Sequence, residues 1–231
     1  MLRADGRVLA GERDCLQVPD FDLGNSPAAL AANGRRGEEL VLATTNGSPA
    51  IVAASSAARR VLVGSLLNLA AVLDAIRTET AVTIVCSGTD GRPALEDVYV
   101  AGRLVAGLDG VSSDAARVAE RVGCAYGAPL GALAESEDGA RLRATGQERD
   151  IAWCARESTI GVVPEVCSTD DGVAVVGPGR RSRAPAGGSS GRREGASPGA
   201  IGRRERGLTA RRAAGGPDNR DPYHRLPDAS R

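Results

Sequence analysis

Three short polar turns carry the residue types best suited to chemistry in this sequence. They read ATTNGS (43–48), GSLLN (64–68) and CSGTDGR (86–92), and each comes at the end of a short apolar run. Their Thr, Ser and Asn side chains are neutral hydrogen-bond donors, and free backbone N–H groups at a helix start favour an anion. The turns therefore predict a binding site for a small anion such as a phosphate or a sulfonate.

The first turn also fits a second interpretation. Asn46-Gly47 between two apolar runs is typical of a β-hairpin. The run that follows Pro49 is rich in Ala and lacks the alternation of a strand, so we favour a strand, a polar turn and a helix. Pro27, Pro49 and Pro93 each follow a polar turn and are expected at the first position of a helix, where the missing N–H costs nothing.

Carboxylates gather near the same turns. Glu12 ends an apolar run, Asp22 lies in FDLGNSP, and Glu96-Asp97 follow the third turn. Acids in the first turn of a helix are also favoured by the helix dipole without any function. The single histidine is His224, near the end of the chain, so a metal in the preceding residues would need carboxylate oxygens, which suits Mg²⁺.

The third turn allows a rival chemistry. Cys86 and Arg92 have the spacing of a cysteine-dependent phosphatase, in which a thiolate attacks phosphorus and an arginine binds the oxygens. No histidine precedes Cys86, and the glycines do not fall where such a loop needs them. The alternative is a cysteine that ends a buried strand.

Short apolar runs alternate with helical patterns, which predicts the elements that position these turns. Strands are expected in RVLAGER, LVLATT, RVLVGS, VTIVCSG and TIGVVPEV, with helical patterns between them. Such alternation indicates parallel βαβ units, so the expected fold is a three-layer α/β/α domain with a mostly parallel sheet. In an open sheet of this kind the carboxyl ends of the strands share one edge, where ligands bind.

The composition divides the chain in two. Residues 1–176 carry 24 acidic residues and 16 arginines, whereas residues 177–231 carry 5 acidic residues and 13 arginines. We expect an acidic α/β domain over 1–176, which argues against nucleic-acid binding by that part. The Gly-, Arg-, Ser- and Pro-rich remainder is expected to be a disordered tail, which either binds RNA or an acidic partner weakly or is a non-functional extension.

The remaining composition bears on the compartment. The five cysteines form no C-x-x-C pair and no even-numbered disulfide framework, and no spanning segment or signal peptide is visible. We therefore expect a cytoplasmic protein with no membrane partner. The sequence leaves open whether it forms a homo-oligomer.

The motifs LAGER, FDLGNSP, TTNGS, GSLLN, CSGT and LEDVYVAG occur in the order and spacing of the 2-phosphosulfolactate phosphatase (ComB) family. The resemblance covers roughly residues 7–166. It implies a magnesium-dependent hydrolase that removes phosphate from 2-phospho-3-sulfolactate in coenzyme M synthesis, with its site at the strand ends of an α/β/α fold. Asp22, Glu96 and Asp97 would be catalytic, and Asp22 and Glu12 would bind Mg²⁺. The matching substrate-binding residues would be Asn25, Ser26, Thr44, Thr45, Asn46, Gly47, Ser65, Asn68, Cys86, Gly88 and Thr89.

One departure from the family pattern bears on activity. Family members carry a DVLRATTT-like segment some forty residues before the LAGER match, whereas Met1 lies only a few residues before it. That segment would supply an acidic residue, hydroxyl groups and a strand. Either the true start lies further upstream, or this copy is a degraded remnant and an inactive anion-binding relic of the family. The cysteine-dependent phosphatase of Cys86 and Arg92 is a separate alternative to an active member of the family.

Overall fold

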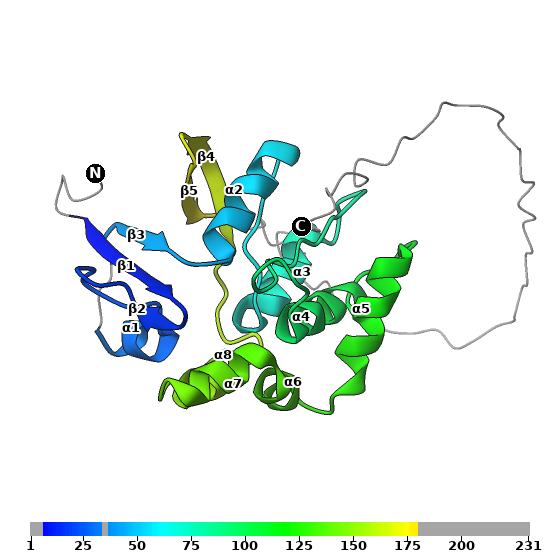
Figure 1. Ribbon diagram of the computed structural model, residues 1–231. Helices are drawn as coiled ribbons and strands as arrows, with labels where there is room; N and C mark the ends of the chain where they lie inside the picture. The colour runs from blue at the N-terminus through cyan, green and yellow to red at the C-terminus, as the bar shows by residue number, and fades with distance from the viewer. Residues whose placement is uncertain (1–6, 34–36, 180–231) are drawn as a thin grey trace, which may run out of the picture. The chain divides into compact units, whose positions relative to one another are not determined.

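The computed structural model describes residues 7–33 and 37–179 (Figure 1). Their secondary structure mixes helices with two small sheets. Strand β5 ends at Pro178, so Gly177 and Pro178 belong to a strand rather than to the predicted tail. The remainder of that predicted tail, from residue 180, lies outside the described residues.

A three-stranded sheet begins the chain, with the order β2-β1-β3. Its strands are β1 (Val8–Arg13), β2 (Leu16–Gln17) and β3 (Leu40–Ala43). β1 pairs with β3 in parallel and with β2 in an antiparallel hairpin, so the sheet is mixed. Helix α1 (Pro27–Asn33) connects this hairpin to β3 and begins at its proline, as expected.

Helix α2 (Gly47–Ala57) follows β3 after three residues, so the strand–turn–helix interpretation is confirmed and the hairpin is not. Pro49 is the third residue of the helix rather than the first, a position whose N–H would also lack a partner within the helix. The helix packs against the hairpin of β4 (Pro164–Asp170) and β5 (Val173–Pro178). A hydrogen bond from Thr169 to Ser55 joins the two at 2.8 Å.

The middle of the chain is helical. A 3₁₀ turn η1 (Leu66–Asn68) leads into α3 (Leu69–Ile76), and α4 (Leu95–Ala106) and α5 (Asp114–Ala125) follow. Helices α4 and α5 lie side by side (Figure 1) because two glycines let their backbones approach closely. A Cβ on Gly102 would lie 1.9 Å from the carbonyl oxygen of Ala119, and one on Gly123 would lie 2.7 Å from the Gly102 carbonyl carbon.

Three short helices complete the helical part: α6 (Pro129–Glu135), α7 (Glu137–Ala144) and α8 (Glu148–Cys154). The stretch LGALAESEDGARLRATG has the pattern of a single helix, which predicts one helical segment over α6 and α7. Ser136 separates them because its extended backbone ends one helix while its hydroxyl accepts the Gly139 N–H and caps the next. On α8, Trp153 lies against the guanidinium of Arg156, 4.3 Å from the ring centre.

Aliphatic side chains and one tyrosine form the core. Tyr99 on α4 is fully buried, meets Tyr126 edge-on, and packs with Leu66 of η1, Leu133 of α6 and Ile151 of α8. A second cluster joins α3 to α4 and consists of Leu69, Val72, Ile76 and Leu104. No helix of residues 7–33 and 37–179 is long and apolar enough to cross a membrane.

The predicted three-layer parallel sheet is not confirmed. Within the described residues only β1 and β3 pair in parallel ladders, and neither RVLVGS nor VTIVCSG forms a strand. A strand needs a hydrogen-bonded neighbour at about 4.8 Å, which an apolar run does not guarantee. Residues 61–63 instead make irregular antiparallel contacts with residues 164–166, and Val82 and Val85 are exposed by 41% and 59%.

Candidate active site

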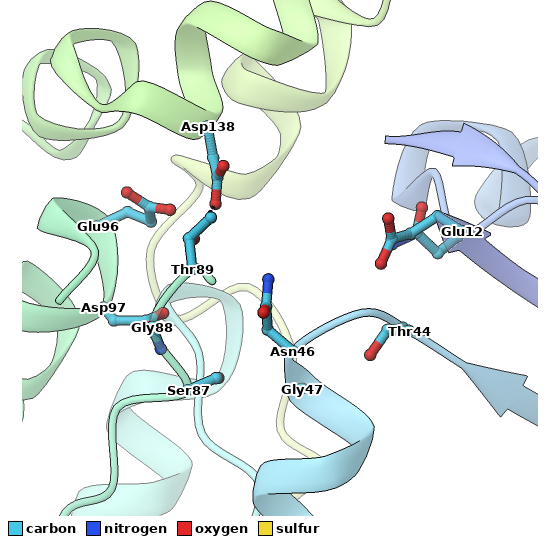
Figure 2. A pocket seen from close by; sticks show the side chains of 11 residues that line it. Glu12, Thr44, Asn46, Gly47, Ser87, Gly88, Thr89, Glu96, Asp97 and Asp138 are labelled. Carbon is cyan, nitrogen blue, oxygen red and sulfur yellow. Dashed lines mark hydrogen bonds between the residues drawn. The ribbon is translucent and has the colours of Figure 1, made fainter. Parts of the chain in front are cut away.

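A polar cavity of about 240 Å³ gathers the ends of β1 and β3 and the starts of α2, α4 and α7 (Figure 2). Four of its side chains are carboxylates, and among the described residues no arginine, lysine or histidine lines it. Its lining residues are Glu12, Asn25, Thr44, Asn46, Gly47, Ser87, Gly88, Thr89, Glu96, Asp97 and Asp138.

The parallel pairing of β1 with β3 sets one wall of this cavity. Gly11 is opposite Ala43 in the ladder, so Glu12 and Thr44 follow at the same edge. The backbones approach closely here, since a Cβ on Gly11 would lie 2.1 Å from the Ala43 carbonyl oxygen. The Glu12 carboxylate accepts hydrogen bonds from the Thr45 N–H at 2.7 Å, the Thr45 hydroxyl at 3.2 Å and the Cys15 N–H at 3.1 Å.

The turn between β3 and α2 leaves hydrogen-bond donors at the cavity. The Thr44 hydroxyl accepts the N–H of Ser48, and the Ser48 hydroxyl accepts the N–H of Thr44, so these two residues satisfy each other. Asn46, at the N-cap, makes no side-chain bond to the helix. Its Oδ1 accepts the Asp90 N–H at 3.4 Å, and Figure 2 shows its amide nitrogen on the cavity side. The start of α2 thus presents an amide group and the positive end of the helix dipole.

A tight turn, residues 88–92, forms the opposite wall. Thr89 and Arg92 exchange two backbone hydrogen bonds, at 2.9 and 3.0 Å. Gly88 has a φ of +67°, and a Cβ there would lie 2.4 Å from the Arg92 carbonyl oxygen, so this position needs glycine. The Gly88 N–H donates to Asp97 at 2.7 Å, and the Thr89 hydroxyl donates to Asp138 at 2.6 Å.

Glu96 and Asp138 bring carboxylates from two helices to this wall (Figure 2). Burial raises the pKa of Glu96, and the neighbouring charge of Asp138 raises it further. Arg141, one turn along α7, forms an ion pair with Asp138 at 3.3 Å. Glu96 therefore keeps its proton to a higher pH than an ordinary glutamate does.

Comparison with known proteins identifies the family. The model of the 2-phosphosulpholactate phosphatase family matches residues 1–169. The chain belongs to the 2-phosphosulpholactate phosphatase family. A probable 2-phosphosulfolactate phosphatase of Deinococcus radiodurans is 39% identical over 71% of both chains, and one of Thermus thermophilus is 40% identical over 68% of this chain and 69% of its own. The 2-phosphosulfolactate phosphatase of Methanothermobacter thermautotrophicus is 34% identical over 69% of this chain and 68% of its own.

The family resemblance in the sequence is thereby confirmed, and the structure shows where the matched residues lie. The cavity brings together nine of the predicted site residues: Glu12, Asn25, Thr44, Asn46, Gly47, Gly88, Thr89, Glu96 and Asp97. The other six, Asp22, Ser26, Thr45, Ser65, Asn68 and Cys86, are not among its lining residues. The roles assigned to all fifteen stay predictions.

Most of the residues outside the cavity lining have structural partners. Asp22 accepts the Leu9 N–H at 2.9 Å, and Ser26 donates to the buried carboxylate of Asp150 at 2.8 Å. The Asn68 side chain accepts the Ser65 N–H and donates to the carbonyls of Val63 and Val162. The Asn68 amide is buried and uses both of its donors, so it has none left for a substrate.

The structure adds two lining residues that the sequence analysis missed, Ser87 and Asp138. Ser87 lies within the CSGTDGR turn, but it is not among the substrate-binding residues that the resemblance implies. Asp138 gives no local signal, because an acid in the first turn of a helix is favoured by the helix dipole alone. Its presence in the cavity depends on how α7 packs.

The geometry does not favour the cysteine-dependent alternative. Desolvation and the carboxylate of Asp97 raise the pKa of the Cys86 thiol, which disfavours the nucleophilic thiolate. Arg92 is paired with Glu137 at 3.3 Å. The N–H groups of Thr89 and Arg92 bond to each other's carbonyls instead of facing a phosphate.

The side chains that could bind a metal ion in this cavity are carboxylates. No group of three or more Cys, His, Asp or Glu side chains that could hold a metal ion occurs within residues 7–33 and 37–179. Mg²⁺ is usually held by only one or two carboxylates together with substrate oxygens and water. A cavity with four carboxylates and, among the described residues, no positive side chain fits that mode of binding and does not fit an all-protein cage.

Proposed function

We propose that the chain is a phosphatase that hydrolyses the phosphate ester of 2-phosphosulfolactate, or of a similar small phosphorylated acid, in the cavity of Figure 2. Water supplies the hydroxyl group that ends on phosphorus, the P–O bond to the carbon skeleton breaks, and sulfolactate and phosphate leave. The single observation that carries the proposal is that the named family covers residues 1–169, which include every lining residue.

The charge of the cavity supports a requirement for a divalent cation. The phosphate, sulfonate and carboxylate groups of the substrate are anionic at neutral pH, and the four lining carboxylates would repel them. Mg²⁺ between the substrate and the carboxylates would remove this repulsion by neutralising charge on the phosphoryl group. Glu12 and Asp97 are candidate ligands. Asp22, which the resemblance implies as a ligand, is bonded to the Leu9 N–H away from the cavity lining.

The chain's own groups divide the remaining work. The Asn46 amide and the start of α2 would bind phosphate oxygens, since both present donors to the cavity. Glu96 suits a general acid, because its raised pKa keeps a proton available for the leaving oxygen. Asn25 and Ser87 add polar atoms for the other anionic groups.

A second candidate is a member of the family that binds its anion without hydrolysis. It is favoured by the position of Asp22, which the resemblance implies as a catalytic residue and metal ligand but which does not line the cavity. Such a protein would be stabilised against heat by sulfolactate or phosphate and would release no phosphate from the ester.

Phosphate release from 2-phosphosulfolactate tests the proposal. We expect turnover with Mg²⁺, loss of turnover with a chelator, and at least a tenfold loss in the variants Glu96→Gln and Asp97→Asn, as for removal of a catalytic acid or ligand. Asp22→Asn tests the role that the resemblance implies for Asp22, which does not line the cavity. A large loss of turnover in this variant would support that role. Asp114→Asn, on the exposed face of α5, is the control. A folded protein with Mg²⁺ and no turnover would contradict the proposal, and ligand stabilisation without turnover would support the second candidate.

A further inference from the structure

The turn of residues 88–92 in the cavity wall is hydrogen-bonded to residues of several other elements. It lies between α4, through the Gly88–Asp97 hydrogen bond, and α2, through the Asp90–Asn46 hydrogen bond. Two backbone hydrogen bonds between Thr89 and Arg92 close the turn. A displacement of this turn would therefore change its contacts with both Asp97 and Asn46.

Helix α7 holds the turn at two points. Asp138 accepts the hydroxyl of Thr89, which is a buried residue, at 2.6 Å. Arg141 donates from Nη2 to the carboxylate of Asp90 at 3.1 Å, and its Nη1 lies 3.3 Å from Asp138. The planar guanidinium of Arg141 thus joins the acid that binds Thr89 to the acid next to Thr89 in the turn.

These contacts fix which atoms the turn can offer to a ligand. The Thr89 hydroxyl has one proton, and it is given to Asp138, so Thr89 does not donate to a substrate oxygen. The Asp90 N–H holds the Oδ1 atom of Asn46 at 3.4 Å, which leaves the amide nitrogen of Asn46 for the cavity. The orientation of Asn46 thus depends on the place of Asp90, which Arg141 holds.

We propose that Asp138 and Arg141 are positioning residues of the phosphatase site, which hold the turn of residues 88–92 so that Asn46 faces the substrate. This role rests on the proposed function, but its structural half, the hold on the turn, does not. Two residues of α7 would then set the positions of groups in a cavity whose other lining residues come mostly from strand ends and polar turns.

Three variants test this arrangement. Arg141→Gln removes the ion pairs with Asp90 and Asp138. Asp138→Asn keeps an oxygen acceptor for Thr89 but loses the charge that pairs with Arg141. Asp138→Leu removes the contacts with both Thr89 and Arg141. Arg117→Gln is the matched control, because Arg117 makes the same kind of i,i+3 pair with Asp114, also at 3.3 Å, on α5. The measurements are kcat and KM for 2-phosphosulfolactate, the melting temperature, and hydrogen exchange of the Thr89 and Arg92 amides.

For Arg141→Gln we expect faster exchange of the two amides and a loss of about tenfold in kcat, since small displacements of positioned groups have effects of this size or larger. KM should change less than kcat, and the melting temperature should remain that of the wild type. Asp138→Leu should lose at least as much as Arg141→Gln, and Asp138→Asn should recover part of that loss.

Other outcomes would overturn the inference. Unchanged exchange in Arg141→Gln would show that the turn is held without α7, and faster exchange with an unchanged kcat would show that its place does not matter. Equal losses in Arg141→Gln and Arg117→Gln would point to a general effect of charge. If the wild type has no turnover, the proposed function fails, and the catalytic role of these residues fails with it, whereas the exchange rates still decide the hold on the turn.

Discussion

Glu12 and Thr45 link the ends of two parallel strands, since both carboxylate oxygens of Glu12 accept hydrogen bonds from Thr45. One bond comes from the backbone N–H and the other from the hydroxyl group. The link fixes the first residues of the turn that leads into α2. A side chain expected to bind a metal is thus also a structural part of the cavity wall.

The variant Glu12→Gln should therefore lose stability as well as activity. Glutamine has one acceptor oxygen, so the bonds to Thr45 and Cys15 cannot all be kept, and we expect a loss of about 1 kcal/mol in the free energy of unfolding. Urea denaturation measures it. Glu39→Gln, which removes an exposed ion pair with Arg7, is the control and should change stability by less than about 0.5 kcal/mol. Equal stability of Glu12→Gln and the wild type would contradict the expected link.

Asn46→Asp should weaken anion binding. The substitution adds a negative charge to a cavity that already has four carboxylates, so inhibition by inorganic phosphate should weaken by about tenfold or more. Ser56→Asp adds the same charge at the other end of α2 and should have little effect. Similar inhibition constants for the two variants would argue against a ligand at Asn46.

Gly102→Ala should destabilise the pair α4–α5. The added methyl group would meet the Ala119 carbonyl oxygen at 1.9 Å, so the helices must separate, and we expect a cost of about 3 kcal/mol from overpacking. Gly127→Ala is the matched control, because a Cβ there meets no atom within 4 Å. Thermal unfolding of both variants compares them, and a stable Gly102→Ala protein would show that the helices can move apart.

The stability of the protein should fall at high pH because of Cys154. Burial raises the pKa of this thiol to about 11, so the folded protein keeps the proton while the unfolded chain loses it at lower pH. The unfolded state then binds fewer protons between about pH 9 and pH 11, and the free energy of unfolding should fall by about 2 kcal/mol over this range. Cys154→Ala should remove this part of the pH dependence, whereas a change at the exposed Cys124 should not. An unchanged alkaline slope in Cys154→Ala would refute the assignment.

Much of the helical structure could be predicted from the sequence, because its signals are local. Pro27, Pro49, the Ser113 cap and the 3.6-residue spacing of apolar side chains indicate α1, α2, α4 and α5 without reference to the rest of the chain. The prediction that Pro93 is the first residue of its helix is wrong, because α4 begins two residues later, at Leu95. The polar turns after β3 and before α4 were found in the same way. They account for most of the residues that line the cavity.

The strands RVLAGER and LVLATT and their parallel pairing were predictable, but the extent of the sheet and the place of Asp138 were not, because these depend on distant partners. VTIVCSG has the composition of a strand, but pairing requires a second strand at the right distance, which its own residues cannot specify. Asp138 reaches the cavity through the packing of α7 beside the turn of residues 88–92. Asn68 looks like a ligand in the sequence and is a buried structural amide. Its bonds to Ser65 and Val63 are local, but its bond to the Val162 carbonyl joins a segment whose proximity appears only in the fold.

The single tryptophan of the chain gives α8 an optical signal of its own. Trp153 lies beside the Arg156 guanidinium. Asp150, three residues before Trp153, accepts a hydrogen bond from the Ser26 hydroxyl, which links the start of α1 to α8. Separation of these two helices would change the surroundings of the indole ring and hence the wavelength of its emission. Intrinsic fluorescence therefore reports on the contact between α8 and the segment after β2 without any added label.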